Sequence, residues 1–167
     1  ARRDGLTGLF NRRAFDESLA MELDRASRTG TAVGLAMIDI DHFKRLNDGH
    51  GHQVGDEVLR VVGEVLREES RRMDVAARYG GEEFAVIFPG ADTADCTLAG
   101  ERMRSALADA AGPVPITVSV GVASVRASAS SPDVLIRRAD DALYRAKAQG
   151  RNRVCTARPA SPVRSIA

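Results

Sequence analysis

The sequence has few cysteines, and those present form no metal-binding or disulfide pattern. Cys96 and Cys155 are the only two, and they make no CxxC pair. The three histidines, His42, His50 and His52, do not repeat at the spacing of four that a helical zinc site uses. The pattern therefore argues against a disulfide-stapled fold and a zinc site, and it fits a reducing compartment.

Long apolar runs and an excess of charge are absent as well. No run approaches the roughly 20 residues of a transmembrane helix, and no signal-peptide pattern opens the chain. The formal net charge of +1 gives no overall basic field, so bulk electrostatics do not favour a nucleic-acid partner. What is present, 44% hydrophobic and 28% charged residues over 167 positions, is typical of one soluble globular domain. Because the chain begins with Ala-Arg-Arg rather than Met, we expect it to be part of a longer protein.

Helices and strands are predicted along nearly the whole chain from apolar periodicity and from cap residues. Helices are expected at 11–29, 42–48, 53–69, 92–110 and 131–149, and strands at 32–40, 73–79, 82–88, 115–123 and 152–156. Asn11 and Ser131 are N-cap candidates, and Gly30 and Gly150 end the helices that those caps begin. The order predicts an α/β (α+β) fold, with a central, mainly antiparallel sheet flanked by helices. Residues 1–156 form the expected domain, and we expect residues 157–167 to be a mobile tail.

The stretch "RYGGEEF", residues 78–84, places two glutamates after two glycines at the start of a predicted strand. The glycines predict a tight hairpin turn and would let a ligand approach the backbone closely. Glu82 and Glu83 point to opposite faces because strand side chains alternate, so at least one carboxylate is presented at the turn. A simple solvated hairpin tip is the alternative interpretation.

A second acid, Asp39, lies inside the apolar run that ends in "IDIDHFKRLND", residues 38–48. A carboxylate among buried apolar residues is costly unless a partner compensates its charge. A hard divalent cation can do so, and carboxylates at neighbouring strand ends suit a two-metal site for phosphoryl transfer. A capping or salt-bridged acid is the alternative.

Nucleotide recognition is suggested by "NDGHGHQVGD", residues 47–56, although no GxxxxGK[ST] or GxGxxG phosphate loop is present. Asn47 and Asp56 together could read a purine edge, and the adjacent N–H donors of guanine suit a carboxylate. Phosphates would then be held by metal, by backbone amides near Phe43 and by basic side chains. Lys147 and Arg151 straddle the end of the last predicted helix, where favourable interaction with the helix dipole is the alternative reason for their charge.

Five segments together resemble one protein family, the GGDEF family of diguanylate cyclases. They are "DGLTGLFNRRAF" (4–15), "DIDHFKRLNDGHGHQVGD" (39–56), "RYGGEEF" (78–84), "VSVGVA" (118–123) and "ADDALYRAKAQGRN" (139–152). The resemblance spans about residues 4–156, and the GGEEF form of the signature loop is one that active members use. It implies a fold similar to the palm of nucleotidyl cyclases and polymerases, and the condensation of two GTP into cyclic di-GMP with release of two pyrophosphates.

The resemblance also implies roles for individual residues. Asp39, Glu82 and Glu83 match catalytic positions, and with the carbonyl of Ile40 they match ligands for two Mg²⁺ ions, with Mn²⁺ as an alternative. Glu82 also matches the candidate base for the 3′-OH. The matched substrate positions are Asn47 and Asp56 for guanine, His52 beside the substrate, Gly80 and Gly81 beneath the nucleotide, and Phe43, Lys44, Lys147 and Arg151 for phosphates.

Regulation and assembly follow from the same resemblance. "RRMD", residues 71–74, matches an inhibitory product site in which Arg71 and Asp74 of one domain and Arg102 of another bind cyclic di-GMP. A chance match that forms only a surface ion pair is the alternative. Catalysis would need a two-fold homodimer, because each domain holds one GTP. An upstream sensor or dimerisation domain is expected, with the catalytic domain in the cytoplasm and membrane anchoring of the full-length protein left open. The alternatives are a silent module that binds GTP or cyclic di-GMP, and a cyclase making a 3′,5′-cyclic mononucleotide.

Overall fold

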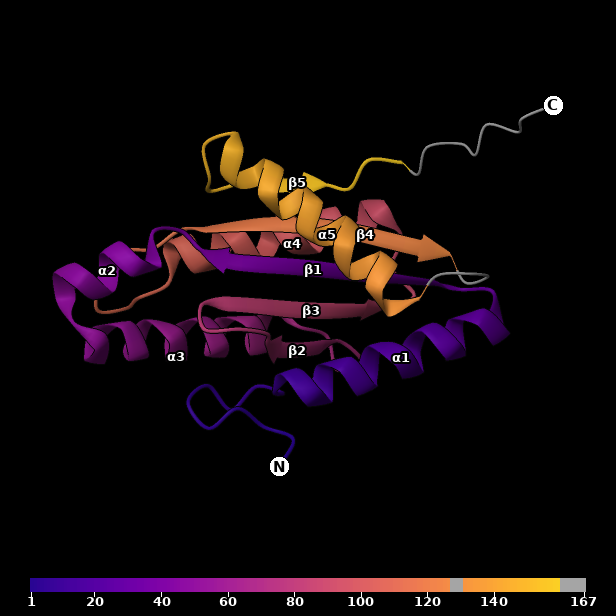
Figure 1. Ribbon diagram of the computed structural model, residues 1–167, viewed down its shortest axis with the longest axis horizontal. Coiled ribbons are helices and arrows are strands. Elements are labelled where there is room, and N and C mark those ends of the chain that lie inside the picture. Colours follow the sequence, from indigo (N-terminus) through magenta and orange to yellow (C-terminus); the bar gives the residue numbers. More distant parts are fainter. Residues whose placement is uncertain (127–130, 160–167) are drawn as a thin grey trace.

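A computed structural model of the chain describes residues 1–126 and 131–159, in which helices and strands follow the predicted order (Figure 1). The helices are α1 (Arg12–Thr29), α2 (Phe43–His50), α3 (His52–Glu69), α4 (Thr93–Asp109) and α5 (Pro132–Ala148). The strands are β1 (Ala32–Ile40), β2 (Val75–Arg78), β3 (Glu83–Pro89), β4 (Val118–Arg126) and β5 (Val154–Thr156). Of the expected tail, residues 160–167 lie outside the described part of the chain. Within the described residues, none of the helices combines the length and the apolar character needed to cross a bilayer.

The strands form one sheet in the order β2-β3-β1-β4-β5, with β1 at its centre (Figure 1). All neighbouring pairs are antiparallel except β4 and β5, which are parallel. The prediction of a mainly antiparallel sheet is therefore confirmed. Helices α1 and α5 cover one face of the sheet and α3 and α4 the other.

The central strand β1 is buried along its whole length because both faces of the sheet carry helices. Its alternate side chains enter two separate cores: Ile38 packs with α3 and α4, whereas Leu35 and Met37 pack with α1 and α5. By the same alternation, Asp39 belongs to the face that carries α1 and α5. This geometry explains why the run reads as continuously apolar, with an acid near its end.

Several predicted strand boundaries differ from the structure, and strand pairing explains one strand and one turn. The strand expected at 115–123 runs instead over Val118–Arg126, because β1 supplies partners only from Ile40, opposite Val118, to Ala32, opposite Arg126. The expected Gly-Gly turn is a longer loop over 79–82, closed by hydrogen bonds from the amides of Tyr79 (2.8 Å) and Gly80 (3.1 Å) to the carbonyl of Glu83. Neither glycine of the loop has a positive φ, so a two-residue hairpin turn is excluded.

The predicted caps hold at both long terminal helices, with one difference. Asn11 accepts a hydrogen bond from the amide of Ala14 at 2.9 Å, and Gly30 ends α1 in the left-handed conformation with φ 70°. Ser131 occupies the N-cap position of α5 with Pro132 at N1, but its side chain makes no capping hydrogen bond.

Candidate active site

Asp39 is buried at the end of β1, with 5% of its surface exposed. It lies in register with Glu83 on β3 and with Ser119 on β4. The ammonium group of Lys147, on the last turn of α5, donates to Oδ2 of Asp39 at 2.9 Å. The salt-bridged interpretation of Asp39 is thus correct for this structure, in which an ammonium group compensates the buried charge.

Burial raises the pKa of Asp39 above its ordinary value. The hydrogen bond and charge of Lys147 oppose that shift, and the nearby charge of Asp41 adds to it. The pKa of Glu82 is also raised, first by burial and then by the charge of Asp39. The site therefore concentrates negative charge that Lys147 only partly offsets.

The signature loop brings its glutamates beside Asp39, although not into a finished metal site. The amide of Ile40 donates to the carbonyl of Glu82 at 3.3 Å, and Glu83 lies opposite Asp39 on the neighbouring strand. Across residues 1–126 and 131–159, no three histidine, cysteine or acidic side chains are arranged to hold a metal ion. The expected ligand set is therefore not preformed. Its oxygen donors nevertheless suit a hard cation, and the Lys147 ammonium stands in for one at Asp39.

A second buried acid, Asp41, lies just beyond β1 and was not singled out from the sequence. Its carboxylate accepts hydrogen bonds from the hydroxyls of Thr117 (2.7 Å) and Ser119 (2.6 Å) and from the amide of Asn152 (3.0 Å). Arg151 and Asn152 both have left-handed φ values, 64° and 47°, which non-glycine residues rarely adopt. Asp41 thus anchors the strained turn after α5 that carries the predicted phosphate contact Arg151.

The predicted base-reading residues lie where α2 meets α3. The side-chain oxygen of Asn47 is buried and has no hydrogen-bond partner among the described residues. It lies against Gly55, where any Cβ would overlap with it, while Asp56 is exposed one position further along α3. The packing of Asn47 against Gly55 thus brings Asn47 and Asp56 to neighbouring positions where α2 meets α3.

The remaining predicted substrate residues differ in how far they are exposed. Lys44, His52 and Arg151 are exposed, and Phe43 is buried at the first position of α2. A Cβ at Gly81 would meet nothing within 4 Å, and one at Gly80 would meet only the side chain of Glu83. The protein itself therefore gives no packing reason for glycine at position 81.

The N-terminal segment holds the signature loop, a role that was not assigned to it from the sequence. Arg78 donates to the carbonyls of Gly80 (3.2 Å) and Gly81 (2.9 Å) and reaches Oδ1 of Asp4 at 3.3 Å. Asp4 in turn accepts from the amide and the hydroxyl of Thr7, both at 2.8 Å. Asp4 and Arg78 lie 74 positions apart in the sequence, so local patterns give no signal for their contact.

The predicted inhibitory residues lie at the other end of β2 from the signature loop. The buried Asp74 carboxylate accepts from the Arg71 backbone at 2.8 Å and from its guanidinium at 3.1 Å. Arg102 donates to the Glu69 carboxylate at 3.1 Å and to the Glu69 carbonyl at 2.9 Å. Both arginines are about half exposed. In this structure the two pairs are satisfied within the chain, so a ligand would have to compete with them.

Comparisons with known proteins agree on the family. The family model described as "Diguanylate cyclase, GGDEF domain" matches residues 1–153. The response regulator PleD of Caulobacter vibrioides is 41% identical over 158 residues, which cover 90% of this chain and 35% of PleD. The chain thus spans about a third of that relative.

Solved structures give the same result for the fold. The GGDEF domain of DgcB from Caulobacter crescentus, in complex with c-di-GMP, superposes with a TM-score of 0.88 at 41% identity, covering 93% of this chain and 95% of that one. The active GGEEF domain of a diguanylate cyclase from Vibrio cholerae gives 0.85 at 31% identity, covering 90% and 98%. With its five-stranded sheet, its buried Asp39 and its GGEEF loop, the chain belongs to the GGDEF-domain family of diguanylate cyclases.

Proposed function

We propose that the chain is the catalytic domain of a diguanylate cyclase, which condenses two GTP molecules into cyclic di-GMP and releases two pyrophosphates. The observation that carries the proposal is Asp39, a buried carboxylate in register with Glu83 that accepts a hydrogen bond from a lysine ammonium. An acid held in this way is suited to exchange its partner for a metal ion. The family to which the chain belongs supports the same activity.

Asp39, Glu82, Glu83 and the carbonyl of Ile40 are the proposed ligands for two Mg²⁺ ions, which Mn²⁺ could replace. The metal would stabilise charge on the transferring phosphoryl group and ease loss of the 3′-OH proton. Glu82 is the proposed base. Its raised pKa favours this role, because a carboxylate that holds a proton more tightly is a better acceptor near neutral pH.

Guanine recognition is assigned to Asn47 and Asp56, with His52 beside the substrate. The Asn47 amide can donate to a ring acceptor, and the exposed Asp56 carboxylate can accept from the adjacent N–H groups of guanine. Asn47→Ala and Asp56→Ala should each weaken GTP binding by about 1–3 kcal/mol, seen as a higher KM with less change in kcat. ATP, with an unprotonated N1 and an N6 amine, should be a poor substrate. Equal competition by ATP would refute the assignment.

The phosphates are assigned to the start of α2 and to the end of α5. The first turn of α2 has no side-chain cap, so the amides near Phe43 and Lys44 are available to an anion. Lys147, in the last turn of α5, and Arg151, in the turn after it, supply positive charge. The open space at Gly81 is consistent with a nucleotide lying across the loop backbone, where a side chain would collide.

Turnover requires two such domains in a two-fold homodimer, so that the 3′-OH of each nucleotide faces the α-phosphate of the other. An upstream sensor or dimerisation domain would set the spacing of the two catalytic domains. The catalytic domains would lie in the cytoplasm. The proposed unit is residues 1–156. Product would inhibit by bridging Arg71 and Asp74 of one domain to Arg102 of another, which requires the Arg71–Asp74 and Arg102–Glu69 pairs to open.

The test is to incubate the chain with GTP and Mg²⁺ at several protein concentrations and to identify the product by mass. Cyclic di-GMP formed with roughly second-order dependence on protein supports the proposal. Binding of GTP without product at any concentration, or with an enforced dimer, would make the chain a silent nucleotide-binding module. A 3′,5′-cyclic mononucleotide would indicate a single-domain cyclase.

A further inference from the structure

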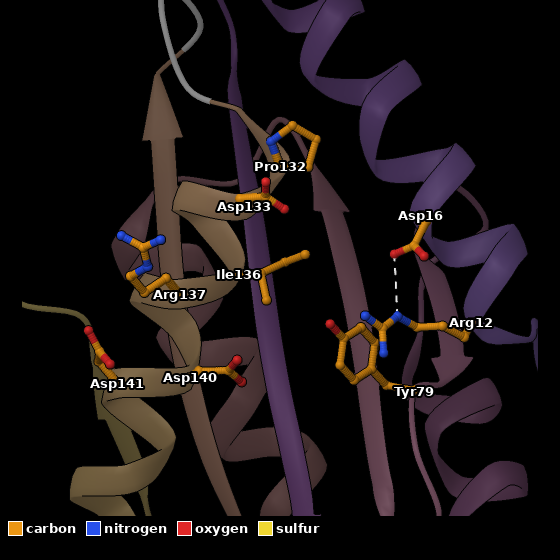
Figure 2. Close-up of a pocket in the computed structure, with 9 residues that line it drawn as sticks. All are labelled: Arg12, Asp16, Tyr79, Pro132, Asp133, Ile136, Arg137, Asp140 and Asp141. Carbon is orange, nitrogen blue, oxygen red and sulfur yellow. Dashed lines mark hydrogen bonds and ion pairs between the residues drawn. The ribbon is translucent and has the colours of Figure 1, made fainter.

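Tyr79 begins the loop over residues 79–82 that carries the GGEEF glycines. It lines a cavity of about 670 Å³ between α1 and α5. Figure 2 shows Arg12 and Asp16 on one side of this cavity, next to Tyr79, and residues of α5 such as Ile136 and Asp140 across from them. Open space therefore lies beside the Tyr79 ring. Two aromatic contacts with α1 hold the ring on the other side.

Those contacts come from one face of α1. The guanidinium carbon of Arg12 lies 3.8 Å from the centroid of the Tyr79 ring, in cation–π geometry. The Phe15 ring meets Tyr79 edge to face, with centroids 5.2 Å apart and planes at 83°. Asp16 accepts a hydrogen bond from Nε of Arg12 at 3.4 Å, one helical turn away, and so limits where the guanidinium can go.

The backbone of Tyr79 links the position of its ring to the candidate site. Its amide donates to the carbonyl of Glu83 at 2.8 Å, and Glu83 lies in register with Asp39. A shift of the ring therefore moves the backbone that fixes the start of β3. Burial raises the pKa of the Tyr79 hydroxyl, in agreement with a partly buried ring.

We propose that Arg12 is a positioning residue for the signature loop: stacked on Tyr79 and steered by Asp16, it keeps the ring out of the α1–α5 cavity and thereby fixes Glu83. Its catalytic consequence rests on the proposed function, because Glu83 is a site residue only in that context. Arg12 is half exposed, and exposed ion pairs and cation–π contacts contribute little to folding stability. Its effect is therefore on the geometry of the loop rather than on the stability of the fold.

The test compares Arg12→Met with Arg13→Met. Arg13 is the next residue of α1 and pairs with Glu17 in the same i,i+4 geometry, at 3.2 Å, but it does not touch Tyr79. The two variants remove the same charge from the same helix. Two measurements are made on each: amide hydrogen exchange of the peptide covering residues 79–83, and kcat with KM for GTP.

Arg12→Met should speed exchange in that peptide by about tenfold, with an unchanged unfolding midpoint, because the loop opens more often while the core is intact. It should lower kcat by about tenfold with little change in KM, since a small misplacement of reacting groups acts on the chemical step. Arg12→Lys, which keeps a cation over the ring, should recover part of both effects. Arg13→Met should behave as the wild type.

Unchanged exchange in Arg12→Met, or equal effects of the two methionine variants, would overturn the proposal. The exchange measurement needs no turnover, so it separates this inference from the proposed function. If the wild type makes no cyclic di-GMP but exchange still responds to Arg12 alone, the positioning role stands and the proposed activity fails.

Discussion

Asp39 and Asp41 are two buried acids, two positions apart at the end of the same strand, with opposite kinds of support. Asp41 accepts hydrogen bonds from two hydroxyls and a backbone amide, which are held by strand β4, by the residue just before it and by the turn after α5. Among the described residues, the side-chain partner of Asp39 is the ammonium group of a lysine that is about a third exposed. The first acid is satisfied by the fold, and the second by a group that can move away.

The contrast separates structural acids from candidate functional ones. Fixed, neutral donors stabilise a carboxylate permanently and leave it little capacity to bind anything else. A flexible cation stabilises a carboxylate only until a better cation arrives. The pKa of Asp39, raised by burial despite Lys147, indicates that its charge is not fully compensated by the protein.

The largest expected effect is the loss of activity in Asp39→Ala. Product formation should fall below detection, because the metal loses its proposed anchor on β1. The fold should remain intact or become slightly more stable, since a buried charge is removed. Cyclic di-GMP synthesis and thermal unfolding, measured side by side, check this. Synthesis at the wild-type rate by Asp39→Ala would remove Asp39 from the mechanism.

Asp41→Ala should destabilise the fold, whereas Asp39→Ala should not. It leaves the Asn152 amide, the buried Ser119 hydroxyl and the partly buried Thr117 hydroxyl without their acceptor, which should lower the free energy of unfolding by about 2–3 kcal/mol. Urea denaturation of the two alanine variants measures the difference. If both variants lose the same stability, the distinction drawn between the two acids is wrong.

These two acids also illustrate what the sequence can and cannot reveal. Asp39 was identifiable because its charge interrupts a buried apolar run, where only a special partner makes an acid tolerable. Asp41 follows the same run, at a place where an acid would be ordinary at a strand end or before a helix. Its importance comes from Thr117, Ser119 and Asn152, which are 76 to 111 positions away.

The fold shows the same difference between local sequence signals, which predict well, and long-range contacts, which do not appear in short patterns. Apolar periodicity and caps located every helix and strand that the structure describes, because these signals are local. The start of β4 was missed by three residues because the ends of β1 determine it. The contacts of Asp4 with Arg78, and of Arg12 with Tyr79, join segments that no short pattern connects.

A smaller effect is expected on metal binding when the mobile partner of Asp39 is removed. Lys147→Met should bind Mn²⁺ without nucleotide about tenfold more tightly than wild type, or about 1.4 kcal/mol, because the ammonium no longer competes for the carboxylate. Lys44→Met is the matched control, since it loses the same charge from an exposed position. Mn²⁺ titration followed by electron paramagnetic resonance checks both. If Lys44→Met gained as much Mn²⁺ affinity, the effect would come from the change in net charge rather than from competition for Asp39.

The smallest effect concerns the pH dependence of stability in metal-free protein. Burial raises the pKa of Asp39 in the folded state, so the folded chain holds that proton more tightly than the unfolded chain does. Stability contributed by the protonated form is present below the unfolded pKa and is lost as pH rises through the folded pKa. Asp39→Asn should match the wild type at low pH and exceed it near neutrality. Thermal unfolding in a chelator tests this, and parallel curves at all pH values would contradict it.

The two cysteines differ in how much of the structure must open before a reagent can reach them. Cys96 is fully buried between α4 and β1, in contact with Gly34, and burial raises the pKa of its thiol to about 12. Cys155 lies on β5, a three-residue strand at the edge of the sheet. A thiol reagent can reach Cys155 by local fraying of that edge, whereas Cys96 becomes reactive only when the core separates. The two labelling rates therefore report edge opening and global unfolding in one sample, with no engineered probe.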